Sequence, residues 1–217
     1  MSGSLPPRIT ACLAAALLAL AAASARAEDA PPAVFGGHGV TFSYPLSWQH
    51  IDGQFQIEMG NSLWSEFFAP VPAPPPPADP AAPAPAPGSP PAATTPSAGD
   101  VYDVVAISAY RLPVSITKKN LARYKTAIRV ALMQLAARAG GSLQSAGTRV
   151  VLGGLPGYRF ELTMPGQGGV TLQSRIVMVF RKKIEYFFNC QSLKDGPLAA
   201  DLSAGCDQVT RSFRAAS

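Results

Sequence analysis

Apolar and polar residues alternate with a period of two in several short stretches of the chain. This period predicts β-strands, because successive side chains of a strand point to opposite faces of a sheet. The candidate strands are residues 39–45, 48–51, 55–59, 148–152 and 157–164, and residues 101–112 are a further candidate because of their β-branched and aromatic content. Pro45 and Pro113 each follow such a stretch, and we expect each proline to end its strand.

A longer alternation of apolar residues covers positions 170–190. It is interrupted at Arg181, Lys182 and Lys183, where three basic residues replace the apolar ones. A polar interruption between two alternating stretches is typical of a turn. The sequence therefore predicts a β-hairpin here, with one apolar face.

The apolar period changes to three and four residues over positions 117–139, which predicts an amphipathic helix of about six turns. Its apolar positions are Leu121, Tyr124, Ile128, Ala131, Leu132 and Leu135. Gly140 and Gly141 predict its end. A second helix is predicted from the spacing of Leu198, Leu202, Cys206, Val209 and Phe213. Strands, a helix, more strands and a closing helix predict an α+β fold, a largely antiparallel sheet covered by helices.

Residues 70–99 hold 13 of the 22 prolines and are otherwise dominated by Ala, Ser and Thr. Such a segment cannot build a core, and it is either a linker between domains or an insertion into one. The piece before it, residues 31–69, is too short to be stable alone. We therefore expect one α+β domain over residues 28–217, interrupted by a disordered insertion at 70–99.

The first 27 residues have the three regions of a secretory signal peptide. Arg8 precedes an apolar run over residues 9–23, and Ala25-Arg26-Ala27 matches a small-x-small cleavage site. The run falls short of the roughly 20 residues that span a bilayer, which disfavours a membrane anchor. Cys12 does not fit a lipoprotein signal, because the apolar region follows it. We expect a periplasmic or secreted protein without a transmembrane helix in its mature form.

Removal of the signal peptide leaves two cysteines, Cys190 and Cys206. In an oxidising compartment such a pair predicts a disulfide, here closing a loop of 15 intervening residues and worth about 3 kcal/mol. A metal site is the alternative, but the two histidines, His38 and His50, are far from both cysteines and show no ligand spacing. We expect neither a metal nor a cofactor.

Charge is divided unevenly along the chain. Residues 28–110 carry eight acids and no Lys or Arg, whereas residues 111–217 carry sixteen bases and five acids. Either the acidic half packs beside the basic half, which we favour, or the basic half binds anionic lipid or polymer. Nucleic acid is a poor candidate partner outside the cytoplasm.

The predicted helix over 117–139 concentrates this positive charge. Its polar side carries six bases and no acid, so it cannot form ion pairs within itself. Lys118, Lys125 and Arg129 follow one another along a single stripe, at steps of seven and four residues. They are candidate binding residues, and a solvated face is the alternative.

Leu63, Trp64, Phe67 and Phe68 form an aromatic cluster directly before the Pro-rich segment. Packing in the core is the simplest interpretation. Alternatively, Trp64, Phe67 and Phe68 line a groove that binds an apolar chain or a partner's side chains.

Signatures of catalysis are weak in this sequence. The Gly-x-Ser-x-Gly pentad of serine hydrolases does not occur, and two histidines leave little from which to assemble a triad. The glycine runs at 36–39 and 166–169 lack the Walker lysine and read as turns. The aspartate pairs Asp100/Asp103 and Asp201/Asp207 have no second catalytic group nearby in sequence. We expect a protein that is not an enzyme, with a site assembled from distant residues as the alternative.

Several segments together resemble the PsbP-like superfamily, which includes DcrB-like and LpqN-like exported bacterial proteins. They are the opening strand 39–45 followed by Trp48, the strand entry 155–160, the strand end 186–190 and the closing helix 207–213. The resemblance covers nearly all of the chain after the signal peptide except the insertion. It implies an α/β/α sandwich and a non-enzymatic role in binding, assembly or maintenance of the envelope, and it brings no catalytic residues.

Two functions of different class follow from these observations. The first is an interaction module of the bacterial cell envelope, whose protein partner meets the basic helix or the Pro-rich segment. The second is a carrier of a lipid-like or amphipathic ligand held between sheet and helix.

Overall fold

The computed structural model describes residues 31–51, 61–71 and 103–216. The predicted signal peptide, the predicted strand at 55–59 and the Pro-rich segment from residue 72 onward lie outside these ranges. Every helix and strand named below belongs to one unit of the chain, Ala33–Ser217.

The described elements are mostly strands. They are β1 (Ala33–Gly37), β2 (Val40–Tyr44), β3 (Trp48–Ile51), β4 (Ser62–Pro70), β5 (Val104–Ile116), α2 (Leu121–Arg138), β6 (Ser142–Leu143), β7 (Thr148–Leu152), β8 (Leu155–Pro165), the short 3-10 helix η1 (Gln167–Gly169), β9 (Thr171–Leu193), α3 (Ala199–Ser212) and β10 (Arg214–Ala215). The large sheet has the order β3-β4-β5-β9-β8-β6, with β7 paired to β8, and the small sheet has the order β1-β2-β10. All the strand pairs are antiparallel, so the predicted α+β class with antiparallel sheets is confirmed.

The strands on either side of the Pro-rich segment are neighbours in the large sheet. In β4, Phe68 lies opposite Val105 of β5. Pro70, which we predicted as the first residue of the insertion, is instead the last residue of β4 and lies opposite Trp48 of β3. A proline is tolerated at this point because the end of a strand needs no further ladder hydrogen bond.

Pro113 does not end the strand that precedes it, contrary to our prediction. Strand β5 continues to Ile116, with an irregular register between Arg111 and Ile116. Arg111 lies opposite Ile184 and Ile116 lies opposite Lys182. Between these two pairs, β5 therefore has more residues than β9. Proline lacks an amide donor and is accepted at such a bulge, where ladder hydrogen bonds are interrupted anyway.

The predicted hairpin over 170–190 is also wrong, because β9 is one continuous strand of 23 residues. Its first half pairs with β8 and its second half with β5, so the chain does not need to reverse. Lys182 has a positive φ of 54°. Before Lys182 the even-numbered residues face α2, and after it they face α3, so the irregular backbone at Lys182 shifts the alternation of β9 by one position. The basic interruption therefore marks a change of face rather than a turn.

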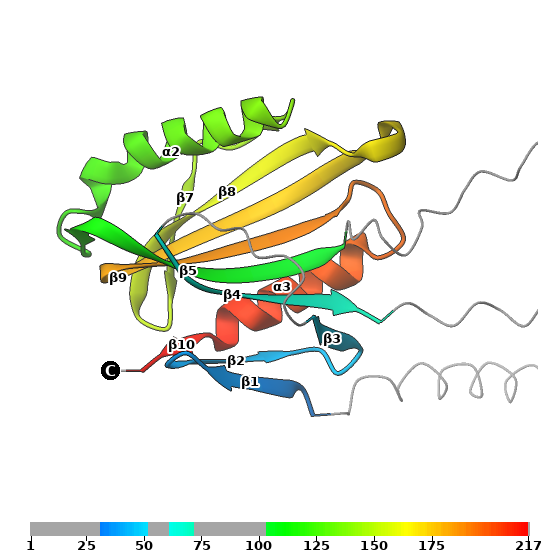
Figure 1. Ribbon diagram of the computed structural model, residues 1–217, viewed down its shortest axis with the longest axis horizontal. Coiled ribbons are helices and arrows are strands. Elements are labelled where there is room, and N and C mark those ends of the chain that lie inside the picture. The colour runs from blue at the N-terminus through cyan, green and yellow to red at the C-terminus, as the bar shows by residue number, and fades with distance from the viewer. Residues whose placement is uncertain (1–30, 52–60, 72–102, 217) are drawn as a thin grey trace, which may run out of the picture. The chain divides into compact units, whose positions relative to one another are not determined.

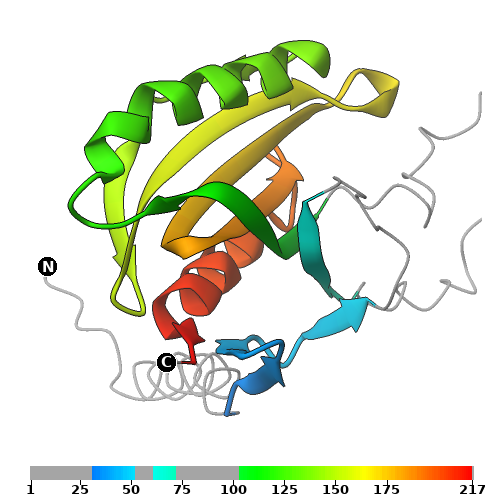
Figure 2. The same cartoon turned by 60° about the vertical axis from the view of Figure 1, so that its left-hand side comes forward.

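Helices α2 and α3 cover opposite faces of the large sheet, as Figures 1 and 2 show. Leu121, Ile128 and Leu132 of α2 pack with Phe160 of β8 and Phe180 of β9 in the α2-side core. On the other face, residues of α3, β5, β9 and the small sheet form the α3-side core, among them Leu202, Val209, Phe188 and Phe42. The small sheet packs against α3 in that core, an arrangement that the sequence did not predict.

Helix α2 begins four residues later than predicted. The side chain of Asn120 accepts a hydrogen bond from the backbone N–H of Thr117 (2.7 Å), which closes a turn before the first helical residue. The helix ends at the predicted glycines, where the N–H of Gly141 donates to the carbonyl of Ala136 (2.8 Å). Ala131 and Leu135, which we predicted on the buried face, are exposed, and Leu135 is 49% exposed.

Candidate functional site

The aromatic residues proposed as a binding cluster lie on both faces of β4. Trp64 and Phe68 point toward the α3-side core, where Phe68 is fully buried. Phe67 lies between them in sequence and therefore points to the opposite face of the sheet, where it is 7% exposed. Alternation along one strand thus prevents the three rings from lining a single groove.

Glu66 lies between these aromatic residues and binds both histidines. Its Oε1 lies 2.8 Å from Nε2 of His38, and its Oε2 lies 2.5 Å from Nε2 of His50. The ring of His38 stacks on that of Trp64, and the ring of His50 stacks on that of Phe68. In each pair the ring centroids are 4.9 Å apart. These contacts join the β1–β2 turn and β3 to β4.

Sequence analysis missed this cluster because its members are 28 and 16 residues apart. Each carboxylate oxygen of Glu66 binds one histidine, so the three side chains do not converge on one point. Among the described residues, no group of three or more His, Cys, Asp or Glu side chains is arranged to hold a metal ion. The arrangement is best suited to holding strands together.

The predicted basic stripe lies on α2 and in the turn before it. Lys118 and Arg129 are exposed, and Lys125 is half-buried with its Nζ 5.6 Å from the centroid of the Tyr158 ring. In the described part of the chain these three residues form no ion pair. The acids of the N-terminal half that the structure describes make other contacts: Glu66 binds the histidines, and Asp103 accepts a hydrogen bond from the N–H of Leu193 (3.1 Å). These described acids of the N-terminal half therefore do not pair with the basic stripe.

The surroundings of α2 are also poor in negative charge. Residues 104–160 contain nine Lys or Arg and no acid. Glu185 is the one acid that the described strands place on the α2 face, since it shares its side of β9 with Phe187. Burial raises the pKa of Glu185 to about 7, so this carboxyl is largely neutral at pH 6 and only partly charged at pH 7. We call Lys118, Lys119, Arg123, Lys125, Arg129 and Arg138 the α2 basic surface.

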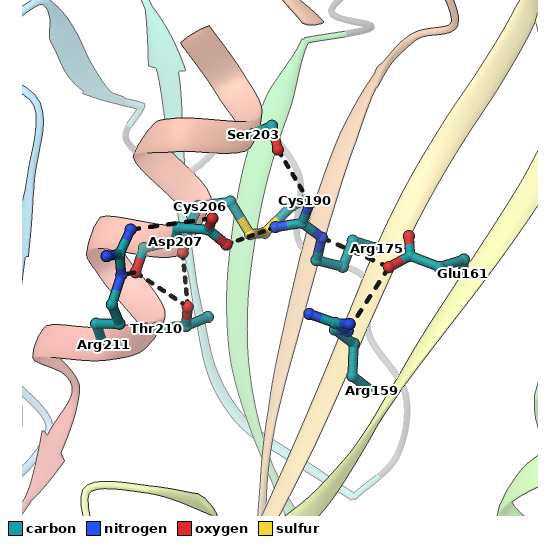
Figure 3. Close-up of a disulfide and its surroundings, with 9 residues drawn as sticks. All are labelled: Arg159, Glu161, Arg175, Cys190, Ser203, Cys206, Asp207, Thr210 and Arg211. Carbon is teal, nitrogen blue, oxygen red and sulfur yellow. Dashed lines mark hydrogen bonds and ion pairs between the residues drawn. A yellow bond between two sulfur atoms is a disulfide. The ribbon is translucent and has the colours of Figure 1, made fainter. Parts of the chain in front are cut away.

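On the opposite face, the predicted disulfide joins β9 to α3 (Figure 3). The Cα atoms of Cys190 and Cys206 are 6.1 Å apart and the sulfur atoms 2.00 Å apart. Both cysteines are buried, at 6% and 0% exposure. The sequence pointed to this pair because removal of the predicted signal peptide would leave an even number of cysteines.

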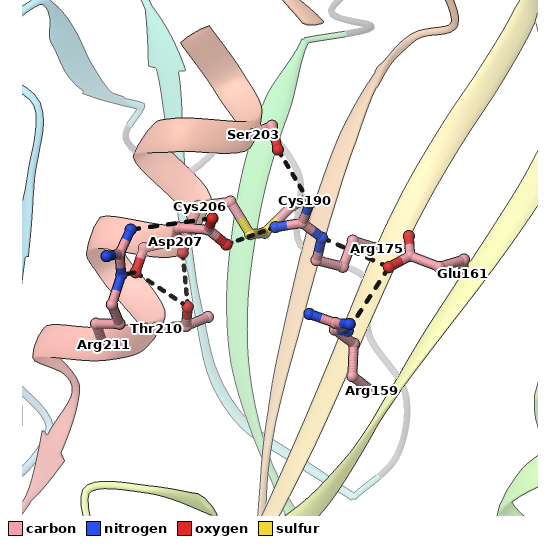
Figure 4. Close-up of polar contacts among 9 residues, drawn as sticks. All are labelled: Arg159, Glu161, Arg175, Cys190, Ser203, Cys206, Asp207, Thr210 and Arg211. Atoms are coloured by element: carbon pink, nitrogen blue, oxygen red, sulfur yellow. Dashed lines mark hydrogen bonds and ion pairs between the residues drawn. A yellow bond between two sulfur atoms is a disulfide. The ribbon is translucent and has the colours of Figure 1, made fainter. Parts of the chain in front are cut away.

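A network of charged groups surrounds the disulfide and is centred on Arg175 of β9 (Figure 4). Its Nη1 donates to Oδ1 of Asp207 (2.7 Å), and its Nη2 donates to Oγ of Ser203 (2.9 Å), both on α3. Its Nε is buried and lies 3.6 Å from Oε1 of Glu161, too far for a hydrogen bond. Burial raises the pKa of the Glu161 carboxyl, an effect that the nearby Arg175 and Arg159 only partly oppose.

A narrow crevice of about 120 Å³ lies beside this network. Its walls are formed by Glu161, Gln173, Arg175, Cys190, Ser192, Ala199, Leu202 and Ser203. Ligand pockets usually measure about 300–1,000 Å³, so this crevice has room for a few water molecules but not for a metabolite or an acyl chain. The network therefore serves to fix α3 on the sheet, and Asp207 acts there as an anchor for Arg175.

No known family model matches the sequence, and a search of curated proteins finds no relative. Solved structures do resemble this one. Cyanobacterial PsbP (CyanoP) from Synechocystis sp. PCC 6803 is 12% identical, with a TM-score of 0.53 over 87% of this chain and 95% of that one. LpqN of Mycobacterium tuberculosis, a protein involved in cell envelope biogenesis, is 12% identical, with a TM-score of 0.49 over 88% of each chain.

A protein from Bacteroides thetaiotaomicron is 12% identical, with a TM-score of 0.46 over 82% of this chain. This chain spans about half the length of that protein, 46%. The likeness to cyanobacterial PsbP supports a PsbP-like fold, as the sequence resemblance implied. At 12% identity it concerns the fold alone. In the part of the chain that the structure describes, no helix has the length and apolar character needed to cross a membrane.

Proposed function

We propose that this protein is an exported, non-catalytic binding or assembly module of the bacterial cell envelope, which meets an anionic partner through the α2 basic surface. For the arrangement of its layers we propose the α/β/α sandwich of PsbP-like proteins. The observation that carries the functional proposal is the positive charge of α2, which forms ion pairs with none of the described acids.

The charge of α2 is available to a partner because the acids that the structure describes do not neutralise it. Lys118, Lys119, Arg123, Arg129 and Arg138 are all exposed. Within the described ranges their side chains make no ion pair, whereas Arg175 and Arg211 on the other face are paired with Asp207. Unpaired bases clustered on one helix attract anionic surfaces over roughly the Debye length, about 8 Å at physiological salt.

Export is supported by two independent features. The first 27 residues have the composition of a signal peptide. The Cys190–Cys206 disulfide is typical of proteins that fold in an oxidising compartment. Together they favour a periplasmic or secreted location.

The two alternatives predicted from the sequence gain less support. A lipid carrier needs an enclosed cavity, and the crevice beside Arg175 is too small for an acyl chain. The larger hollows of the described residues, of about 570, 350 and 340 Å³, are open grooves at the surface. An enzyme needs converging catalytic groups, and the Arg175 network instead pairs its charges with one another. We therefore favour a binding role.

Retention on a polyanionic resin tests the proposal. The secreted protein is applied to immobilised polyphosphate at low ionic strength and eluted with salt. We expect K118Q/R123Q/R129Q to elute at much lower salt than the natural protein, because surface attraction of this kind depends on these charges. The matched control, R149Q/K194Q/R211Q, removes the same charge from other exposed positions and should elute close to the natural protein.

Equal effects of the two triple variants would show that only net charge matters, and the proposed surface would be wrong. Thermal melts of both variants check that they remain folded.

A further inference from the structure

Exposed apolar side chains lie on α2 among its bases. Val130 and Met133 are each 45% exposed, although Ile128 and Leu132 beside them in sequence are buried. Residues three and four apart share a face of a helix, so Thr126, Val130, Met133 and Ala137 form one line on the outward side. This line follows the exposed Arg123 and passes beside the exposed Arg129.

The outer side of α2 therefore changes character along its length. Lys119 lies in the turn before the helix and Arg123 in its first half, whereas the exposed apolar residues Val130 and Met133 lie in its second half. With 18 residues, α2 is about 27 Å long, so charged and apolar groups lie within one extended strip. Helices that lie in the plane of a membrane surface also combine bases with exposed apolar residues, although on opposite faces rather than in opposite halves.

We propose that α2 docks on the surface of an anionic lipid bilayer, with Arg123 and Arg129 at the headgroups and Val130 and Met133 entering the boundary of the acyl chains. This inference rests on the proposed function and names the partner of the same surface.

A bilayer fits this strip better than a soluble polyanion or an acidic protein. A polyanion would use the charges but would leave Val130 and Met133 exposed to water. A lipid surface offers both an anionic layer for the arginines and apolar chains directly beneath it. The long stems of Arg123 and Arg129 let their charged ends stay in the headgroup layer while the helix lies lower.

The packing of α2 limits how deeply it can enter. Leu121, Ile128, Leu132 and Ala136 are committed to the core of the domain, so only the outer side meets lipid. Two half-exposed apolar side chains give shallow insertion. Binding is therefore reversible, and it needs the bases and the apolar residues together.

Co-sedimentation with vesicles tests the inference. The secreted protein is mixed with vesicles of phosphatidylglycerol and phosphatidylcholine, or of phosphatidylcholine alone. We expect binding to the anionic vesicles that weakens as salt rises, and little binding to the neutral ones. V130Q/M133Q should bind the anionic vesicles at least about tenfold more weakly, because two apolar side chains no longer leave water.

A matched control changes two exposed valines elsewhere, in V34Q/V151Q, and should leave vesicle affinity unchanged. V130Q/M133Q should keep its retention on immobilised polyphosphate, since its charges are intact. This pair of results separates lipid docking from binding of anions in general, and melting temperatures check the folding of both variants.

If the natural protein binds polyphosphate but not anionic vesicles, or if V130Q/M133Q binds vesicles as well as the natural protein does, the lipid inference is wrong and the proposed function stands. If the natural protein binds neither, both are wrong.

Discussion

The two long helices cover opposite faces of one sheet and are held by different means. Helix α3 is tied by the disulfide to β9, by Arg175 through Asp207 and Ser203, and by Ser212, whose Oγ accepts a hydrogen bond from the N–H of Ser43 (2.8 Å). Helix α2 has none of these ties among the described residues. Four buried side chains and the contact of Lys125 with Tyr158 hold it.

This difference indicates that the α3 side stabilises the domain, whereas the α2 side presents its side chains to solvent. On the α3 side, charged groups pair with other residues of the domain, and a disulfide links the helix to β9. On the α2 side, the charges face outward, and apolar residues are left exposed beside them. Stability should therefore depend strongly on the α3 side, whereas binding should depend on the α2 side.

Removing the disulfide should have the largest effect on stability. We expect C190A/C206A to lower the free energy of unfolding by about 3 kcal/mol, because the loop between the cysteines is freed in the unfolded chain. Guanidinium unfolding with and without reductant measures this loss. The natural protein should lose a similar amount in reductant, and the variant should be insensitive to it. A variant as stable as the natural protein would contradict the anchoring role.

The buried carboxyl on the α2 face gives a pH dependence of comparable size. The pKa of Glu185 is raised from 4.5 to about 7, so the folded protein holds this proton more tightly than the unfolded chain does. Stability should fall as pH rises from about 4.5 to 7 and then level off, by at most about 3 kcal/mol, since one pKa unit corresponds to about 1.4 kcal/mol.

E185Q removes this titration, and it should be more stable than the natural protein at pH 8 and about equal to it at pH 4. Urea unfolding across this range tests the prediction. If the free energy of unfolding changes with pH by the same amount in E185Q and in the natural protein, Glu185 is ionised in the folded state as readily as in water.

Adding a single methyl group to α3 should also lower the free energy of unfolding. A Cβ at Gly205 would lie 2.1 Å from the ring of Trp48, which is itself buried. We expect G205A to lower the free energy of unfolding by about 2 kcal/mol, as overpacked core sites do. A127S on the exposed side of α2 is the control and should change it by less than about 0.5 kcal/mol. Similar effects of the two changes, measured by urea unfolding, would remove the distinction between the helices.

Substituting one arginine on each face compares the two faces most directly. Its expected effect on the free energy of unfolding is the smallest. R175Q breaks the bonds to Asp207 and Ser203 and should lower the free energy of unfolding by about 1 kcal/mol, because these bonds are only partly screened by solvent. R129Q should leave it unchanged within about 0.5 kcal/mol. A larger loss in R129Q would show that α2 uses its charge for folding, against our proposal.

Much of the fold could be predicted from local patterns. Alternation located β2, β7 and β8, helical spacing located α2 and α3, and two glycines predicted the end of α2. Two errors arose where a local signal has more than one structural meaning. Pro113 and the basic run at Lys182 both resemble strand ends, yet each lies at an irregular point of a continuing strand.

The candidate site was predictable only in part. The bases of α2 are close in sequence, so their shared surface follows from helical geometry. Glu66 with His38 and His50, and Arg175 with Asp207, join residues that are 16 to 32 positions apart. Nothing in the sequence marks them as neighbours.

The sequence by itself determined the periodic elements, the division of charge and the cysteine pair, because each depends on composition or on spacing within one segment. Only the tertiary structure decided which face each strand residue occupies and which charges find partners. The shift at Lys182 reverses the faces of β9, and the fold brings Asp207 to Arg175 while leaving Arg129 exposed. Such choices depend on distances between elements, which local patterns do not encode.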